Sequence, residues 1–119
     1  RRQMLTELKP AIDAQQLQRL QEAVSVVHVS EALLDYLQAI LDHSRRPGLF
    51  QSGLSPRAGL AILRSARAWA FIHGREHVLP EDLQRVLAPV VGHRLRAYDE
   101  RHSDSDELVQ QLIADVPIP

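Results

Sequence analysis

The sequence predicts an all-α domain, a bundle of four or five helices with at most one very short extended segment. Apolar residues recur at helical spacing along most of the chain, whereas the strict alternation of a half-buried strand is nearly absent. Capping or breaking residues stand at the ends of most periodic segments. The length of 119 residues, with 45% hydrophobic and 24% charged residues, is typical of one globular domain with its own core.

A first helix of about three turns is expected after Asp13. Asp13 and Gln16 match the capping-box pattern, in which each side chain binds the backbone N–H of the other residue. The apolar face of this helix carries Leu17, Leu20 and Val24. The valine-rich stretch 26–29, with Val26, Val27 and Val29, then favours a short extended link or a very small strand.

A second helix is expected after Ser30, whose hydroxyl suits an N-cap. Arg45 and Arg46 lie near the negative end of its dipole, and Pro47-Gly48 stops it. The predicted core face of this helix consists of Leu33, Leu34, Leu37, Ile40 and Leu41.

The third helix is the clearest element of the sequence. Ser55 is the expected N-cap, Pro56 fits the first turn, and Gly74 ends the helix about five turns later. One side of this helix groups Ile62, Ala66, Trp69 and Ala70, which we expect to face the core, with His73 on the same side as a half-buried residue at the helix end. The opposite side groups Arg57, Arg64 and Arg75, with Arg67 on the flank. We call these four residues the arginine face and expect it to meet something outside the domain.

Two further helices are expected in the last third of the chain. The fourth opens at Leu79-Pro80-Glu81-Asp82, carries Leu83, Val86, Leu87 and Val90 on its apolar face, and is bent or ended by Pro89. The polar run 102–106 predicts a flexible connection. The last helix spans about Ser105 to Asp115, packs Leu108, Leu112 and Ile113, and cannot continue past Pro117.

Charge balance and cysteine content exclude several classes of function. Fourteen Lys and Arg residues against fifteen Asp and Glu residues exclude a strongly basic nucleic-acid binder. Without cysteine there is no disulfide framework or thiolate metal site, and a reducing compartment is permitted. No apolar run reaches the roughly 18–20 residues of a membrane span. His73 and His77 have metal-ligand spacing, but Gly74 separates them and no third ligand is suitably placed, so we predict no metal site.

Arg57 is the candidate functional residue that physics alone singles out. A cation in the first turn of a helix opposes the dipole, at a cost of about 0.3–1 kcal/mol. Free N–H groups at the same place bind anions, so the arginine makes sense if a phosphate is brought to Ser55, Pro56 and Arg57. The alternative is a solvated arginine whose stem covers apolar surface. A nucleic-acid patch on the arginine face ranks third, because Glu76, Glu81 and Asp82 offset its charge.

Three segments carry a resemblance to a known family. They are Gly53-Leu54-Ser55-Pro56-Arg57-Ala58-Gly59-Leu60, then Ala66-Arg67-Ala68-Trp69-Ala70, and Gly74-Arg75-Glu76-His77-Val78-Leu79-Pro80-Glu81-Asp82-Leu83. Shorter agreements lie in 26–36, 44–45, 91–95 and 114–119. Together these segments closely resemble the C-terminal helical lid of the MoxR family of AAA+ ATPases. Departures from the family pattern are Leu54, where alanine is usual, and Ser44, where threonine is usual.

The resemblance implies a division of the chain and a role for one arginine. Residues 1–12 would be the strap from an ATPase core that is missing here, and residues 13–119 the lid. Arg57, with Ser55 and Pro56, would be the sensor 2 element that reaches the γ-phosphate of ATP bound with Mg²⁺ to the core. Because both nucleotide-binding motifs of the core are missing, we expect no ATP hydrolysis by this chain alone.

The resemblance also implies partners. They are the chain's own AAA+ core, neighbouring subunits of a hexameric ring and proteins with a von Willebrand factor A domain, in the bacterial cytoplasm. The intact protein would be a chaperone-like ATPase that assembles or activates metal-cofactor enzymes. Arg64, Arg67 and Arg75 are the candidate interface residues. The alternative, from a different functional class, is a stand-alone helical protein-interaction module that uses the arginine face.

Overall fold

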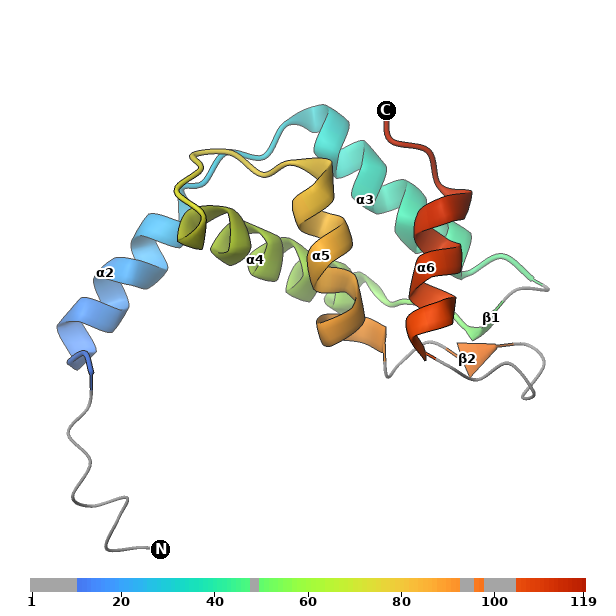
Figure 1. The fold of residues 1–119 in the computed structure, drawn as a ribbon, viewed down its shortest axis with the longest axis horizontal. Coiled ribbons are helices and arrows are strands. Elements are labelled where there is room, and N and C mark those ends of the chain that lie inside the picture. The colour runs from blue at the N-terminus through green and yellow to red at the C-terminus, as the bar shows by residue number, and fades with distance from the viewer. Residues whose placement is uncertain (1–10, 48–49, 93–95, 98–104) are drawn as a thin grey trace, which may run out of the picture.

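The computed structural model describes residues 11–47, 50–92, 96–97 and 105–119, and it confirms the all-α prediction. Its helices are α2 (Ala14–Ser25), α3 (Glu31–Ser44), α4 (Pro56–Ile72), α5 (Pro80–Val91) and α6 (Ser105–Asp115). A small antiparallel pair joins β1 (Phe50–Ser52) to β2 (Arg96–Ala97), with Phe50 opposite Ala97. Figure 1 shows α3, α4, α5 and α6 gathered into a bundle from which α2 projects.

The helix ends follow the local signals in the sequence. Asp13 Oδ1 accepts the N–H of Gln16 at 2.8 Å, and Gln16 Oε1 accepts the N–H of Asp13 at 2.9 Å, which confirms the capping box. Ser30 Oγ accepts the N–H of Leu33 at 3.1 Å. Gly74, just beyond α4, has a φ of 74°, a left-handed conformation that glycine adopts without steric cost. Local capping chemistry therefore fixes where these helices begin and end.

The core lies between α3, α4, α5 and α6. Its largest fully buried apolar side chains are Tyr36, Ile40, Leu54, Ile62, Leu83, Leu87, Val91, Val109 and Leu112. Leu34, predicted for the core, is 44% exposed, whereas Tyr36 takes the buried position and its hydroxyl accepts a hydrogen bond from Gln84 at 3.0 Å. Trp69 is half-buried at the edge of the core, and His73 is exposed rather than half-buried.

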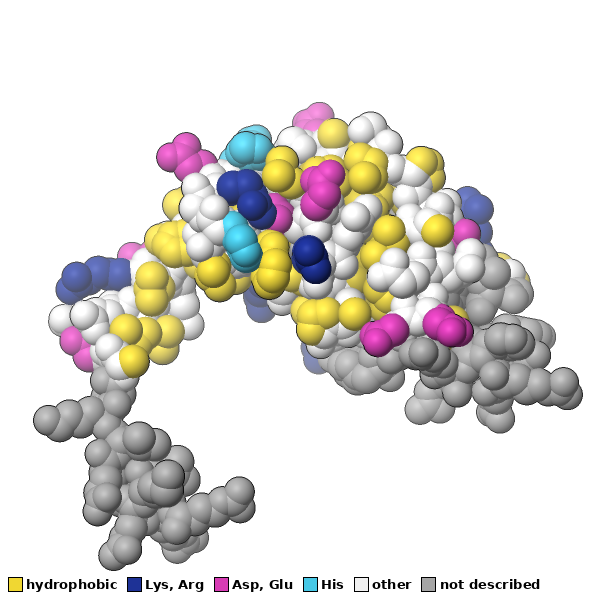
Figure 2. Space-filling view, viewed as in Figure 1, with side chains coloured by type: hydrophobic (Ala, Val, Ile, Leu, Met, Phe, Trp, Pro, Cys, Tyr) yellow, Lys and Arg dark blue, Asp and Glu magenta, His cyan; other side chains and the backbone are white. Residues whose placement is uncertain are grey.

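Helix α2 departs from the sequence prediction. Leu17 and Leu20 are 47% and 42% exposed, and none of the twelve residues of α2 is buried. The main contact of α2 is with α4, and the rest of the helix projects away from the bundle (Figure 1). Hydrophobic side chains are accordingly visible on the surface of α2 in Figure 2. The apolar stripe of α2 is real, but the described chain covers it only in part, at Val24, which is half-buried.

The extended link after α2 ties two connections together. His28 forms a parallel bridge with His77, in which the N–H of His28 donates to Glu76 O and the N–H of Val78 donates to His28 O, both at 2.9 Å. The expected extended segment near residues 26–29 is therefore a single bridge. The pair β1–β2 was not predicted, because segments of three and two residues are too short to show alternation.

The remaining expectations concern α5, the strap and the polar run. Pro89 lies inside α5, which ends two residues later at Val91. Residues 1–10 of the expected strap and residues 102–104 of the polar run lie outside the described residues. None of the helices in the described ranges is long and apolar enough to cross a membrane.

Candidate functional site

The first turn of α4 is the candidate site that the sequence indicated. Ser55 is the N-cap, and its hydroxyl accepts the N–H of Ala58 at 3.1 Å. Pro56 occupies the first helical turn, where its fixed φ suits the helix and its missing N–H costs nothing. Arg57 follows and is exposed, with no hydrogen bond or ion pair to another described residue. A free cation therefore stands at the positive end of the α4 dipole.

The chain just before this turn is held by the end of α3. Leu54 is buried, and its N–H donates to Ser44 Oγ at 2.9 Å. The carbonyl oxygen of Leu54 accepts a hydrogen bond from Arg45 Nε, also at 2.9 Å. The first turn of α4 thus starts from a fixed point of the bundle.

A shallow groove runs beside the same turn, between α3 and α4. It has a volume of about 400 Å³ and is lined by Leu34, Leu37, Gln38, Leu41, Pro56, Gly59, Leu60 and Leu63. Gly59 brings the helices close, because a Cβ there would lie 2.8 Å from Leu41 Cδ1. An exposed guanidinium next to an apolar groove suits a ligand or partner that combines an anionic group with an apolar one.

Arg64 and Arg67 lie in a different groove, between α2 and α4. This groove has a volume of about 490 Å³ and is lined by Leu20, Gln21, Val24, Ser25, Arg64, Arg67 and Ala68. Arg64 is exposed, whereas the Nε of Arg67 is buried without a hydrogen-bond partner in the described part of the molecule. The structure therefore brings these two arginines together and separates them from the groove beside Arg57.

Arg75 does not share a side of α4 with Arg57 and Arg64. The helix ends at Ile72, so Arg75 lies beyond it, and its Nη2 donates to Oδ1 of the buried Asp82. Asp82 Oδ2 also accepts the N–H of Leu79 at 2.7 Å, which satisfies the start of α5. The placement of Arg75 on the arginine face is therefore wrong. Asp82 was missed as its partner, although an acid three residues into a helix is a capping-box signal.

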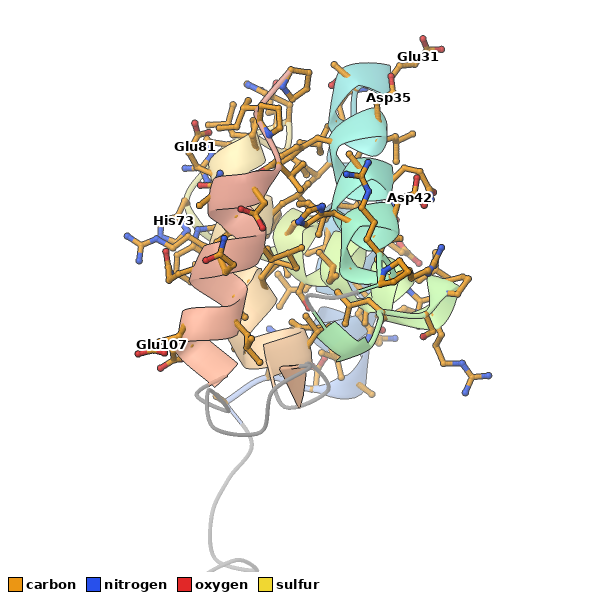
Figure 3. The ribbon with its side chains drawn as sticks, turned by 90° about the vertical axis from the view of Figure 1, so that its right-hand side faces the viewer. Glu31, Asp35, Asp42, His73, Glu81 and Glu107 are labelled. Atoms are coloured by element: carbon orange, nitrogen blue, oxygen red, sulfur yellow. The ribbon has the colours of Figure 1, made fainter. Side chains whose placement is uncertain are left out.

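The two histidines with metal-ligand spacing lie in different local structures. His73 Nδ1 is 2.8 Å from Trp69 O, and the rings of His73 and Trp69 lie 4.5 Å apart with an angle of 35°. Figure 3 shows His73 at the side of the bundle opposite α3. His77 belongs to the bridge with His28. Among the described residues, no group of three or more His, Cys, Asp or Glu side chains could hold a metal ion.

Comparison with known proteins places these features in a family. The family model described as AAA lid domain matches residues 44–115. The matched range contains all of α4, which lines both grooves, and all of α5 and α6. The chain is 35% identical to Protein MoxR of Paracoccus denitrificans over 112 residues, covering 80% of this chain and 33% of that protein. It is 34% identical to Chaperone MoxR1 of Mycobacterium tuberculosis over 117 residues, covering 90% and 30% respectively.

Two further proteins also match most of this chain and about a third of their own length. The Uncharacterized protein YeaC of Bacillus subtilis is 27% identical over 115 residues, which covers 94% of this chain and 36% of that protein. A crystal structure of a "putative ATPase" from Cytophaga hutchinsonii superposes with a TM-score of 0.75 and 25% identity, covering 82% of this chain and 33% of that one. The chain thus spans about a third of the length of the relatives it matches.

Proposed function

The chain belongs to the AAA lid domain family, and from this premise we propose that it is the lid of a MoxR-type ATPase, closing over nucleotide bound to a core domain. The length of the relatives supports a longer parent, because the matched part is only 30–36% of each curated protein named above. In such a parent the core would hold ATP and Mg²⁺, and the lid would contribute side chains from one edge.

The observation that carries the proposal is the exposed, unpaired Arg57 in the first turn of α4. Transfer of a phosphoryl group spreads negative charge over its oxygens, and a preorganised guanidinium stabilises that charge. Ser55 and Pro56 fix the backbone from which the arginine side chain extends. We therefore assign Arg57 the role of the sensor 2 arginine, which reaches the γ-phosphate when the lid closes.

Within the proposed parent, the core and the lid contribute different groups to the nucleotide site. The binding energy for adenine and Mg²⁺ comes from the core, so this chain alone binds ATP weakly and does not hydrolyse it. Arg64 and Arg67 line the groove between α2 and α4, and we assign them as contacts for a neighbouring subunit of a ring. The resemblance to MoxR proteins extends the proposal to a chaperone-like role in assembling metal-cofactor enzymes, with a von Willebrand factor A protein as partner.

A second candidate function rests on that same groove. A stand-alone interaction module would bind a helix or loop of another protein there, with Leu20 and Val24 as the apolar floor and Arg64 as the charged rim. In that case Arg64→Ala would weaken binding of the partner, whereas Arg57→Ala would leave it unchanged.

The test is Arg57→Ala in the full-length ATPase that contains this lid. We expect ATP turnover to fall by about 10²–10³-fold, the loss typical of removing one preorganised charge. The melting temperature of the lid stays nearly unchanged, because Arg57 has no described partner to lose. Arg85→Ala is the matched control, since it removes the same charge from an exposed position of α5 to which no role is assigned, and its turnover stays at the wild-type value. Wild-type turnover in Arg57→Ala would refute the assignment.

A further inference from the structure

The end of α3 is hydrogen-bonded to Leu54, just before the first turn of α4, although about ten residues separate the two helices in sequence. We propose that Ser44 and Arg45, at the end of α3, are positioning residues for Arg57. They hold the backbone of Leu54, three residues ahead of the arginine, and so set the point from which its side chain extends. This inference rests on the function proposed for Arg57.

Ser44 makes the buried half of this connection. Its side chain is completely buried, its hydroxyl donates to Leu41 O at 2.6 Å, and its oxygen accepts the N–H of Leu54 at 2.9 Å. The hydroxyl thus links the backbone of α3 to the backbone before α4 through one atom. A buried polar group with both roles satisfied is costly to disturb, because either backbone partner would lose its hydrogen bond away from water.

Arg45 makes the outer half. Its Nε donates to Leu54 O at 2.9 Å, so the N–H and the C=O of Leu54 are both held, one by each residue. Nη1 of Arg45 lies 3.6 Å from Asp42 Oδ1, an exposed pair that adds little. Figure 3 shows Asp42 on the outer side of α3, close to its end. Two hydrogen bonds to opposite groups of one residue fix its orientation as well as its place.

Gly53 explains how the two segments come so close. A Cβ at this position would lie 2.5 Å from Arg45 Cγ and 2.9 Å from Ser44 O. Because Ser44 O is backbone, neither the end of α3 nor the approach to α4 can stay in place with a side chain at residue 53. The glycine is therefore required for close approach and not for a left-handed φ, which among the described glycines belongs to Gly74.

The short path from Leu54 to Arg57 transmits any movement. The Leu54 side chain is buried in the core, Ser55 caps the helix and Pro56 fixes the first turn. No freely rotating link stands between the held residue and the arginine. A displacement of about 1 Å at a reacting group can cost about 10²-fold in rate, so the hold on Leu54 matters for turnover.

The test is a double-mutant cycle on ATP turnover in the full-length ATPase. We expect Ser44→Ala to lower kcat by about tenfold or more in the wild-type background, and to lower it no further in the Arg57→Ala background. Tyr36→Phe is the matched control, because it removes a hydrogen-bonded hydroxyl from the same helix, about two turns before Ser44, and that hydroxyl is bonded to Gln84 and not to Leu54. Its kcat stays at the wild-type value.

Arg45→Met tests the same idea without disturbing a buried site. It keeps the stem that packs over Gly53 and removes the donor to Leu54, and Arg46→Met is its neighbouring control. We expect a loss of kcat for Arg45→Met and none for Arg46→Met. The positioning role is overturned if Ser44→Ala lowers kcat by the same factor in the wild-type and Arg57→Ala backgrounds. It is also overturned if neither Ser44→Ala nor Arg45→Met lowers kcat. If the single variant Arg57→Ala keeps wild-type turnover, the function proposed for Arg57 is itself refuted.

Discussion

Replacement of Asp82 by alanine is expected to destabilise the bundle by about 3 kcal/mol. The Asp82 side chain is 2% exposed and satisfies two groups at once. It pairs with Arg75 Nη2, and it accepts the N–H of Leu79 at 2.7 Å. One carboxylate therefore joins the turn after α4 to the first turn of α5.

The magnitude follows from what each partner loses. Removing one member of a buried ion pair costs about 3–5 kcal/mol, because the other charge is left without compensation. The Arg75 side chain is 31% exposed and can recover some hydration, which places the loss at the lower end of that range. The Nε of Arg75 is already buried without a partner in the described structure, so little else can replace the carboxylate. The value of about 3 kcal/mol includes the loss of the hydrogen bond that the Leu79 N–H donates to Asp82.

The assay is urea unfolding of the 119-residue chain, followed by far-ultraviolet circular dichroism. Glu81→Ala is the matched control, because Glu81 lies in the same first turn of α5 but is exposed. It loses only its interaction with the helix dipole, about 0.3–1 kcal/mol. A loss below about 1 kcal/mol for Asp82→Ala, within the range of an exposed pair, would refute the reasoning.

Two other expectations concern the ends of α4 and α2. Gly74→Ala lowers the free energy of unfolding by about 1–2 kcal/mol, because residue 74 has a φ of 74°, which alanine adopts only with strain. No atom lies within 4 Å of the new Cβ, so no packing contact offsets this cost. Gly74→Asn costs less, because asparagine tolerates this conformation better. Thermal unfolding measures both, and a neutral alanine contradicts the left-handed conformation. Deletion of residues 1–25 leaves a cooperative unfolding transition, because no residue of α2 is buried. Loss of that transition in calorimetry shows that α2 is part of the folding unit.

Helix ends could be predicted from the sequence because capping is local. Asp13 with Gln16, Ser30 and Ser55 each bind an N–H within three residues, so neighbours along the chain contain the whole interaction. The same holds for the position of the candidate site, since Ser55, Pro56 and Arg57 are consecutive. No distant contact was needed to place that arginine at the start of α4.

The sequence predictions are wrong where burial or chain direction depends on a contact with an element distant in sequence. Helical periodicity shows that Leu17 and Leu20 share a side, but not that another helix fails to cover them. The wheel that grouped Arg75 with Arg57 extends past Ile72, and the left-handed Gly74 redirects the chain there. The hold of Ser44 on Leu54 joins residues ten apart through a hydroxyl, and neither residue type signals it in advance.

The bridge between His28 and His77 decides how the molecule bears load. Helix α2 ends at Ser25, and three residues later His28 makes two backbone hydrogen bonds of 2.9 Å, one through its N–H and one through its C=O. A pulling force applied to α2 therefore acts on these two bonds first. Because the bridged segments run parallel, a pull along the chain shears both bonds together instead of peeling them in turn. Force from the N-terminal side thus reaches the α4–α5 hairpin before it reaches α3. The bridge is a mechanical coupling between α2 and the far end of the helix that carries Arg57.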